Sequence, residues 1–346
     1  MFTDQRLTEA YEKAKKVYFD DQSRIVFMSD AHRGDGSLSD EFLKSRNIFV
    51  HALNEYYENG YTFVEVGDGE EFLEYSNFEH IKNAHTDVYA LIKKFFDEDR
   101  YIRIFGNHDI YLQNPRFVEK NFGINYDEFT EEFFDFMKGL DPQEAIILKH
   151  RYTSQELFVI HGHQGDAPND QFWFFTMLSI KFFWRFFHRF GIKNPASPSK
   201  NINRRHKIEK NYSKWIVEHQ RPLICGHTHR FKFPKDKSVP YFNTGCGIYP
   251  ASITAIELTE GCIRLVRWKT YVNDTGLLYI KRETMRGPEP IEAFDTRKPQ
   301  GVVEYLTMRK KQRMKKSREE RAAFREEQMD EHETHEKSEK EELDDQ

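Results

Sequence analysis

Short apolar runs in the first two thirds of the chain each end in a polar cluster. Ile25–Met28, for example, is followed by Ser29-Asp30-Ala31-His32. Runs of this length, rich in β-branched and aromatic residues and closed by Gly, Asp, Asn or His, are typical of strands. The predicted strands are 25–28, 62–66, 101–105, 157–160 and 223–225.

Helix-like stretches at 42–57 and 78–96 separate the first three strands. This alternation predicts an α/β fold. After residue 230 the pattern becomes β-rich, with strands expected at 241–245, 253–258 and 262–268 and a hairpin turn at 259–261. Because open α/β sheets bind ligands beyond the carboxyl ends of their strands, the five polar clusters predict one shared site.

The polar clusters carry the ligands that divalent metals use. Carboxylate, imidazole and amide oxygen bind Mn, Fe or Zn. One histidine at a strand end is usually structural, but five clusters in the same context favour a metal site. The candidate residues are Asp30, His32, Asp68, Asn107, His108, His161, His227 and His229.

Composition excludes several classes of protein. Of 346 residues, 38% are apolar and 15% aromatic, which allows a sizeable core. The longest uncharged apolar stretch, 171–180, is too short to span a bilayer. The three cysteines form no Cys-x-x-Cys motif, and the charged N-terminus resembles neither a signal nor a transit peptide. We therefore expect a cytoplasmic protein.

The charge of the chain is uneven. Net charge is −5, but residues 309–318 hold seven basic and no acidic residues, whereas 319–346 hold 13 acidic and four basic ones. This tail is either a solvated helix or disordered. The rest of the chain is close to neutral, which argues against nucleic acid as a partner.

An aromatic insertion lies between the fourth and fifth predicted strands. Thirteen of the 19 residues in 172–190 are apolar. A helix apolar on most sides is buried, or it contacts lipid or an apolar ligand. A break at 194–198 follows, then basic residues including Arg204 and Arg205, and then an amphipathic helix with an apolar face of Ile208, Tyr212, Trp215 and Ile216.

Five motifs, taken in order, resemble the calcineurin-like metallophosphoesterase superfamily. The resemblance covers about Ile25 to Leu258. Its blocks are Asp30-Ala31-His32, Gly67-Asp68-Gly69-Glu70-Glu71, Gly106-Asn107-His108-Asp109, His161-Gly162-His163 and Gly226-His227-Thr228-His229.

The resemblance implies a β-sandwich flanked by helices and a site for two divalent metals, with Mn favoured and Fe or Zn as alternatives. It implies that Asp68 bridges the metals and that a bridging hydroxide attacks phosphorus. It also implies that His108 stabilises the phosphate oxygens or protonates the leaving group. The implied ligands are Asp30, His32 and His229 for the first metal, and Asn107, His161 and His227 for the second.

Three further residues belong to the predicted site. Glu71 stands where the superfamily often has an acid that orients the catalytic histidine, and the alternative is a charge in the first turn of a helix. His163 is expected to support the ligands or contact substrate. Arg33 is expected either to bind a substrate phosphate or to form a surface salt bridge.

The insertion is similar to the helical cap of bacterial UDP-2,3-diacylglucosamine hydrolases. That resemblance implies a cap at about 167–221, a phosphoesterase domain at 1–300 and a charged tail at 301–346. It also implies that Arg204 and Arg205 meet substrate phosphates and that aromatic residues meet acyl chains or a membrane. Two motifs differ from those hydrolases, which commonly have Arg in place of His108 and Asp in place of His163.

These observations favour a metal-dependent phosphohydrolase acting on a phosphate ester or anhydride. The expected substrate is a phosphorylated small molecule or a lipid-like nucleotide diphosphate. If the substrate is lipid-like, we also expect peripheral contact with a membrane. The alternatives are a phosphoprotein phosphatase or nuclease of the same superfamily, or a non-catalytic scaffold. A scaffold is expected to have lost a ligand or His108, and this chain has lost neither.

Overall fold

A computed structural model describes residues 2–127, 130–166, 201–235, 237 and 239–297. One compact unit comprises Met1–Arg297, and the chain divides there from a second unit, Lys298–Gln346. The second unit lies outside the described residues, and so do the aromatic stretch 172–190 and the charged tail.

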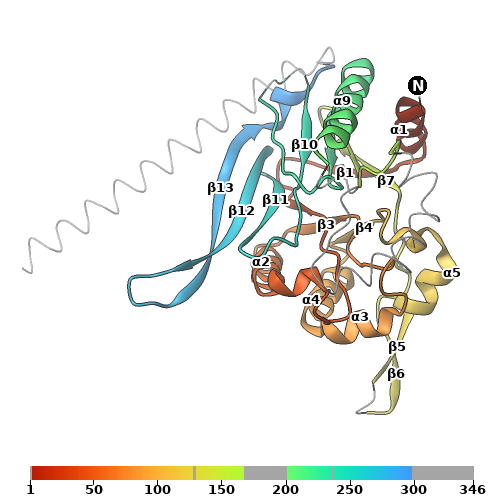
Figure 1. Cartoon of the computed structure of the whole chain (residues 1–346). Helices are drawn as coiled ribbons and strands as arrows, with labels where there is room; N and C mark the ends of the chain where they lie inside the picture. Colours follow the sequence, from red (N-terminus) through yellow and green to blue (C-terminus); the bar gives the residue numbers. More distant parts are fainter. Residues whose placement is uncertain (1, 128–129, 167–200, 236, 238, 298–346) are drawn as a thin grey trace, which may run out of the picture. The chain divides into compact units, whose positions relative to one another are not determined.

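Two mixed sheets form the centre of this unit (Figure 1). The order of the six-stranded sheet is β13-β12-β11-β2-β3-β4, in which β2, β3 and β4 are parallel and the other neighbours antiparallel. The order of the five-stranded sheet is β1-β7-β8-β9-β10, in which only β7 and β8 are antiparallel. The strands are β1 (Lys15–Phe19), β2 (Ile25–Met28), β3 (Thr62–Val66), β4 (Tyr101–Ile104), β7 (Ala145–His150), β8 (Glu156–Ile160), β9 (Leu223–Cys225), β10 (Tyr241–Asn243), β11 (Ser252–Thr259), β12 (Cys262–Val272) and β13 (Leu278–Pro290).

The two sheets pack face to face around a shared apolar core. Alternate residues of a strand point to opposite faces, so β2 contributes to two cores at once. Ile25 and Phe27 pack in the cluster between the sheets, while Val26 and Met28 pack in the cluster under the helices. All four are buried, which explains why this strand has a continuous apolar run instead of alternation.

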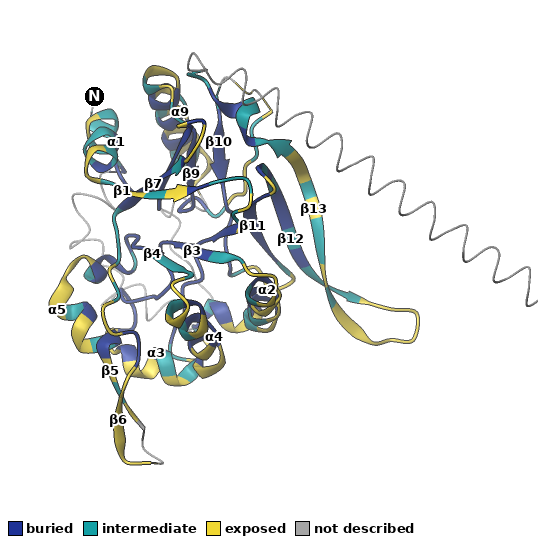
Figure 2. Cartoon of the chain, turned by 180° about the vertical axis from the view of Figure 1, so that it is seen from behind, coloured by how far each residue is buried: buried dark blue, intermediate teal, exposed yellow. Residues whose placement is uncertain are grey.

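Helices cover the outer face of each sheet. The six-stranded sheet carries α2 (Arg46–Glu58), α3 (Phe78–Ala84) and α4 (Thr86–Asp97), and the five-stranded sheet carries α1 (Phe2–Lys13) and α9 (Ile202–His219). Figure 2 shows the result: the strands are mostly buried and the helices expose their outer sides. The expected α/β architecture, a sandwich flanked by helices, is confirmed for the described part of the chain.

Two predicted elements differ in the structure. The helix expected at 78–96 is two helices that meet at His85, whose buried Nε2 lies 2.8 Å from Asp40 Oδ2. Helix α9, expected as the end of the cap, packs on the five-stranded sheet instead. Its Tyr212 and Trp215 are buried there, and Trp215 Nε1 donates to Thr8 Oγ1 on α1 (3.1 Å).

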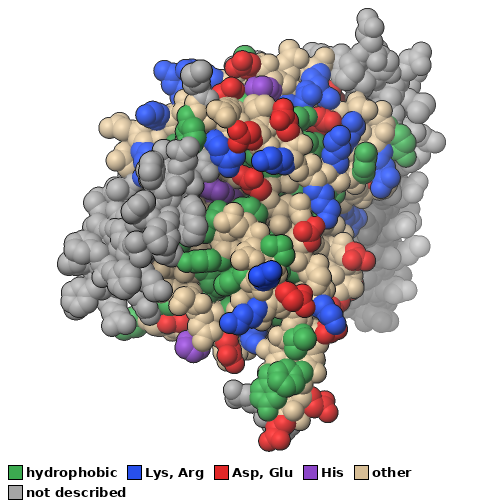
Figure 3. Space-filling model, turned by 90° about the vertical axis from the view of Figure 1, so that its right-hand side faces the viewer, with side chains coloured by type: hydrophobic (Ala, Val, Ile, Leu, Met, Phe, Trp, Pro, Cys, Tyr) green, Lys and Arg blue, Asp and Glu red, His purple; other side chains and the backbone are tan. Residues whose placement is uncertain are grey.

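The remaining elements lie at the edges. They are α5 (Pro115–Val118), 3₁₀ turns at Glu41–Lys44, Ile110–Gln113 and Ile291–Phe294, a π-helical turn at Glu119–Gly123, and a hairpin of β5 (Ile124–Asp127) and β6 (Glu132–Asp135). Figure 3 shows hydrophobic and acidic side chains together on the projecting β5–β6 hairpin, where Phe133 is 76% exposed. No helix in the described ranges is long and apolar enough to cross a bilayer.

Candidate metal centre

The five polar clusters predicted from the sequence meet at one place. Strands β2, β3 and β4 are parallel neighbours, so the loops that follow them leave the same edge of their sheet. Strands β8 and β9 are likewise parallel, and the loop after β8 is tied to the loop after β9 because Gly226 N donates to the His161 carbonyl (2.8 Å). The sandwich therefore brings together side chains from distant parts of the chain.

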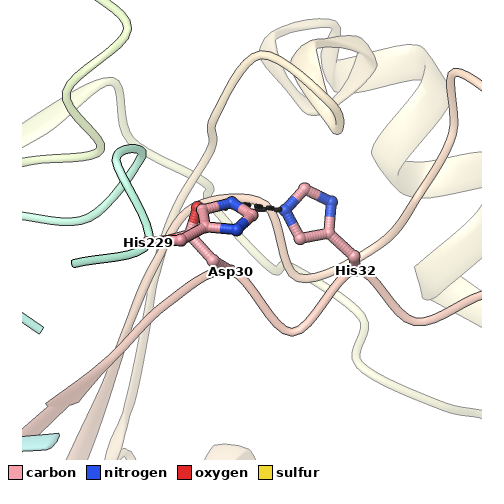
Figure 4. A group of neighbouring side chains, drawn as sticks. All are labelled: Asp30, His32 and His229. Carbon is pink, nitrogen blue, oxygen red and sulfur yellow. Dashed lines mark hydrogen bonds and ion pairs between the residues drawn. The ribbon is translucent and has the colours of Figure 1, made fainter. Parts of the chain in front are cut away.

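Asp30, His32 and His229 form the first group (Figure 4). Nε2 of His32 lies 3.2 Å from Nε2 of His229, and Asp30 Oδ1 lies 3.1 Å from His229 Nε2. Atoms that share a metal at about 2 Å are separated by about 3 Å. These three donors therefore have the spacing of ligands on one ion.

Asp68, His161 and His227 form the second group, and all three are buried. Asp68 Oδ2 lies 3.1 Å from His161 Nε2 and 3.7 Å from His32 Nε2, so its carboxylate stands between the two groups. The Asn107 amide follows β4, and its buried Oδ1 has no hydrogen-bond partner within the described part of the chain.

Several of these side chains have one polar atom hydrogen-bonded to the protein and a second polar atom without an aligned hydrogen bond. Asp30 Oδ2 accepts from the His227 backbone N–H (3.0 Å) and from the Ser29 hydroxyl, while its buried Oδ1 has no aligned hydrogen bond to any described residue. His161 Nδ1 donates to the Val66 carbonyl (2.9 Å), and its buried Nε2 likewise has no aligned hydrogen bond to any described residue. Metal-bound histidines are held in this way by their second nitrogen. The residues present thus fit a divalent metal.

The backbone at the candidate ligands is strained. Asp30, His32, Asp68, His227 and His229 have φ between 46° and 64°, and they are half of the ten such non-glycine residues in the described ranges. Each left-handed residue costs on the order of 1–3 kcal/mol and is typically found at functional sites. The site is also closely packed, because a Cβ on Gly106 would collide with Asp68 Oδ1.

Glu71 connects the first group to His108. Its carboxylate accepts from Nδ1 of His32 (2.9 Å) and from Nδ1 of His108 (2.8 Å). Burial raises the pKa of Glu71, but the charge of His108 and the hydrogen bonds from both histidines outweigh it and hold this pKa at about 2. Helix α3 begins only at Phe78, so the alternative interpretation of Glu71 as a first-turn helix charge is wrong.

His163 is buried beside the second group. Its ring centroid lies 5.6 Å from that of His161, and its Nδ1 has no hydrogen-bond partner in the part of the chain that is described. Burial lowers the pKa of His163 well below the usual value, and the charges of His161 and His227 lower it further. A neutral, buried ring supports the neighbouring ligands better than it would contact substrate.

Both expectations for Arg33, a substrate-phosphate contact and a surface salt bridge, are wrong. Its side chain is buried, so it forms neither a surface salt bridge nor a phosphate contact. Nη1 donates to Glu65 (2.7 Å) and Nη2 to Glu70 (2.6 Å). The sequence alone did not show that these two carboxylates are buried and pair with Arg33.

Arg33 belongs to what we call the charge network, which consists of Arg33, Glu65, Glu70, Arg103 and Asp109. Arg103 contacts all three acids. Asp109 also accepts from the backbone N–H of Gly69 (2.8 Å) and of Gly106 (2.5 Å). The charge network therefore ties the loops that carry Asp68 and Asn107 to each other.

Asp166 is a residue that sequence reasoning missed. Its Oδ2 lies 3.3 Å from His227 Nε2, and Arg204 Nη2 donates to both carboxylate oxygens (2.7 Å each). Burial raises the pKa of Asp166, but the hydrogen bond and charge of His227 and the contacts of Arg204 lower it to about 2. Arg204, expected at a substrate phosphate, instead holds a carboxylate against a candidate ligand. The available signal was an acid three residues after His163.

Two other features stand apart from the metal centre. A cavity of about 700 Å³ lies between α1 and α9, and Asp166, which contacts His227, is among its lining residues. Besides the two ligand groups and the group of His32, Glu71 and His108, a further acid–histidine group is formed near the surface of the same helices by Asp4, Glu218 and His219. The His219 ring stacks on Trp215 at 4.7 Å, which gives this histidine a structural role.

Comparison with known proteins gives a distant likeness. No family model and no curated protein match the chain. Among solved structures, the crystal structure of Chaetomium thermophilum Vps29 covers 79% of this chain and all of its own, with 9% identity and a TM-score of 0.38. A point mutant of a cold-active protein tyrosine phosphatase covers 79% of this chain and 82% of its own, with 12% identity and a TM-score of 0.38.

The chain's own residues therefore carry the identification of the site. Strand ends from both sheets bring imidazole, carboxylate and amide donors into two adjoining groups, with Asp68 between them. The donors include no thiolate, a set that suits Mn, Fe or Zn. The five motifs that resemble calcineurin-like metallophosphoesterases thus converge on one candidate metal centre.

Proposed function

We propose that this protein is a two-metal-dependent hydrolase of phosphate esters or anhydrides. The observation that carries the proposal is the pair of adjoining ligand groups with the Asp68 carboxylate between them, 3.1 Å from one histidine and 3.7 Å from the other. Buried donors without hydrogen-bond partners are costly, so their concentration here favours a bound cation.

In this proposal the first group, Asp30, His32 and His229, holds one metal. Asn107, His161 and His227 would hold the second, and Asp68 would be shared between the two. When bound, two divalent cations supply charge that clamps phosphate oxygens and lowers the pKa of a water molecule. The anchoring of Asp30 by the His227 N–H and of His161 by Val66 keeps the ligands in place without the metal.

His108 is the proposed catalytic histidine. Its side chain is 24% exposed, against 8% for His32 and 14% for His229, so it is the histidine of the centre most open to solvent. Glu71 holds its Nδ1, which leaves Nε2 to donate a hydrogen bond to a phosphate oxygen or a proton to the leaving group. Glu71 acts through both histidines as a positioning residue.

The substrate class we favour is a phosphorylated small molecule or a lipid-like diphosphate. Its lipid-like form depends on residues 172–190, which lie outside the described residues. A phosphoprotein phosphatase is a second candidate, because the same ligand set would serve hydrolysis of a phosphoprotein as well as of a small phosphate ester. A scaffold without catalysis is disfavoured by the intact ligand set and by His108 beside it.

The test is an assay of metal-reconstituted protein on three substrates: a phosphomonoester, a phosphodiester and a nucleoside-diphosphate sugar. We expect two divalent metals per chain by elemental analysis, and turnover of at least one substrate that chelation abolishes. At most one tightly held metal after Mn reconstitution, or metal loading without turnover of any phosphate ester or anhydride, contradicts the proposal.

A further inference from the structure

The hairpin of β12 and β13 projects beyond the sandwich (Figure 1). Strand β11 pairs with β12 only as far as Lys269, so within the described residues the rest of β12 and its partners on β13 pair with each other alone. Asn273 organises the turn, because its Oδ1 accepts from the backbone N–H groups of Thr275 (3.1 Å) and Leu277 (2.8 Å). Every residue in 272–279 is exposed. The hairpin therefore presents an ordered tip to its surroundings.

This tip is apolar although it is exposed. Its four large apolar side chains are 45% to 71% exposed, and they are Val272, Leu277, Leu278 and Tyr279. Val272 pairs across the hairpin with Leu278, so these side chains are gathered in one place. Single exposed apolar residues are ordinary on a protein surface, whereas a contiguous group marks a contact surface.

The two strands have the same order of side chains away from the tip. The register joins an aliphatic pair, then a tyrosine pair and, after one intervening pair, a lysine pair: Val272–Leu278, Tyr271–Tyr279, Thr270–Ile280 and Lys269–Lys281. The two tyrosine rings stack with their centroids 5.8 Å apart. The surface of a bilayer has the same order, because hydrocarbon is followed by the interface that tyrosine prefers and then by charged headgroups that attract lysine.

The lysine pair leaves positive charge uncompensated. No ion pair joins Lys269 or Lys281 to a residue that the structure describes. Glu283 lies two positions from Lys281 on the same face of β13, but its carboxylate is bound to Arg267 (2.7 Å). Like charges directly opposite each other on a sheet repel, so an anionic surface would relieve this repulsion. Asp274, in the turn, is the one acidic residue between the two lysines in the sequence, and its charge opposes the attraction.

We propose that the tip of the β12–β13 hairpin inserts into the surface of an anionic lipid bilayer. The aliphatic side chains of the tip enter the hydrocarbon, the tyrosines lie at the interface, and the two lysines contact the headgroups. This segment is distinct from residues 172–190, for which the resemblance implies lipid contact, and the inference does not rest on the proposed hydrolase function. One short apolar tip with two lysines gives weak and reversible binding, as single anchoring elements do.

Cosedimentation of the full chain with lipid vesicles tests the proposal without any need for turnover. We expect vesicles of equal parts phosphatidylserine and phosphatidylcholine to bind about 10-fold more tightly than pure phosphatidylcholine, since both lysines favour an anionic surface and Asp274 opposes it. Leu277→Ser combined with Leu278→Ser should weaken binding to the anionic vesicles by at least about 10-fold. Lys269→Gln combined with Lys281→Gln should abolish the preference for phosphatidylserine.

Asp274→Asn should strengthen binding to the anionic vesicles by about 5-fold, a gain that loss of folding cannot produce. Phe133→Ser is the matched control, because it removes a 76% exposed aromatic side chain from the β5–β6 hairpin and should leave vesicle binding unchanged. Equal binding of the wild type to the two kinds of vesicle, or wild-type behaviour of either double variant, overturns the proposal. Absence of vesicle binding overturns it too, and self-association in sedimentation velocity that the leucine changes abolish would then assign the tip to a second copy of the chain.

Discussion

Two buried polar clusters lie next to each other in this protein, and they differ in how completely they are paired. In the charge network, nearly every charged atom has a partner, and Arg103 Nε is the buried exception. In the metal centre, Asn107 Oδ1 and His163 Nδ1 are buried and have no hydrogen-bond partner within the described residues. Asp30 Oδ1 and His161 Nε2 lie 3.1 Å from His229 Nε2 and Asp68 Oδ2, but neither contact is an aligned hydrogen bond.

This difference in pairing indicates that the two clusters have different roles, one in stability and one in ligand binding. A buried group left unpaired costs about 1–3 kcal/mol, so a cluster of incompletely paired groups is unfavourable unless a ligand completes it. The metal centre also contains five strained residues, whereas none of the five residues in the charge network has a left-handed φ. The charge network is therefore satisfied by residues of the described chain, whereas the incompletely paired atoms of the candidate metal centre are available to a bound cation.

Asp68→Asn should produce the largest effect, because it removes the carboxylate whose Oδ2 lies 3.1 Å from His161 Nε2 of one ligand group and 3.7 Å from His32 Nε2 of the other. We expect loss of both metals and a fall in activity of more than about 100-fold, beyond the loss typical for residues that only support a ligand. Elemental analysis and turnover measure this. Asp97→Asn, at a surface ion pair, is the matched control. Full metal content with unchanged activity would show that Asp68 is misassigned.

His108→Ala should lower kcat by about 10²- to 10⁴-fold and leave the metal content unchanged. The reason is that His108 lies outside the two groups that contain Asp30 or Asp68 and is grouped instead with His32 and Glu71, whose carboxylate accepts from its Nδ1. His80→Ala, an exposed histidine on α3, is the control. Loss of metal in the His108 variant would place this residue among the ligands instead.

Arg33→Met should act on stability, because it leaves Glu65 and Glu70 buried with one cation fewer. Removing one partner of a buried pair costs about 3–5 kcal/mol of unfolding free energy. Arg46→Met, at a partly exposed pair with Asp87, should cost about 1 kcal/mol or less.

The double variant Arg33→Met with Glu70→Met should recover part of the loss, since it removes a carboxylate along with the cation. Urea unfolding measures all three variants. Equal stability of Arg33→Met and Arg46→Met would remove the distinction between the charge network and an ordinary surface pair.

Glu71→Gln should have the smallest effect of the four, about 10- to 100-fold in metal affinity or activity, as is usual for groups that orient ligands. The amide can accept from one histidine but does not carry the charge that attracts both. Glu79→Gln, on the exposed side of α3, is the control. A variant with wild-type kinetics and metal content would restrict Glu71 to a packing role.

The sequence by itself determined the strands that carry the site and the types of donor at their ends. Strand β2 was expected at 25–28 and β3 at 62–66, and the structure has both with these bounds. The reason is that the signal is local: a short apolar run indicates the strand, and the residues that end it and the candidate ligands follow directly in the chain. The motif residues are adjacent in the chain, so their chemistry is visible without any contact between distant segments.

The tertiary structure alone decided what those residues meet. His32 and His229 are 197 positions apart, and Arg33 pairs with carboxylates 32 and 37 positions away. Arg33 and Arg230 look alike in the sequence, each following a candidate histidine ligand. One is buried among acids and the other is exposed beside Tyr249. Burial and pairing depend on which strands become neighbours and which loops leave the same edge, and no local pattern encodes that.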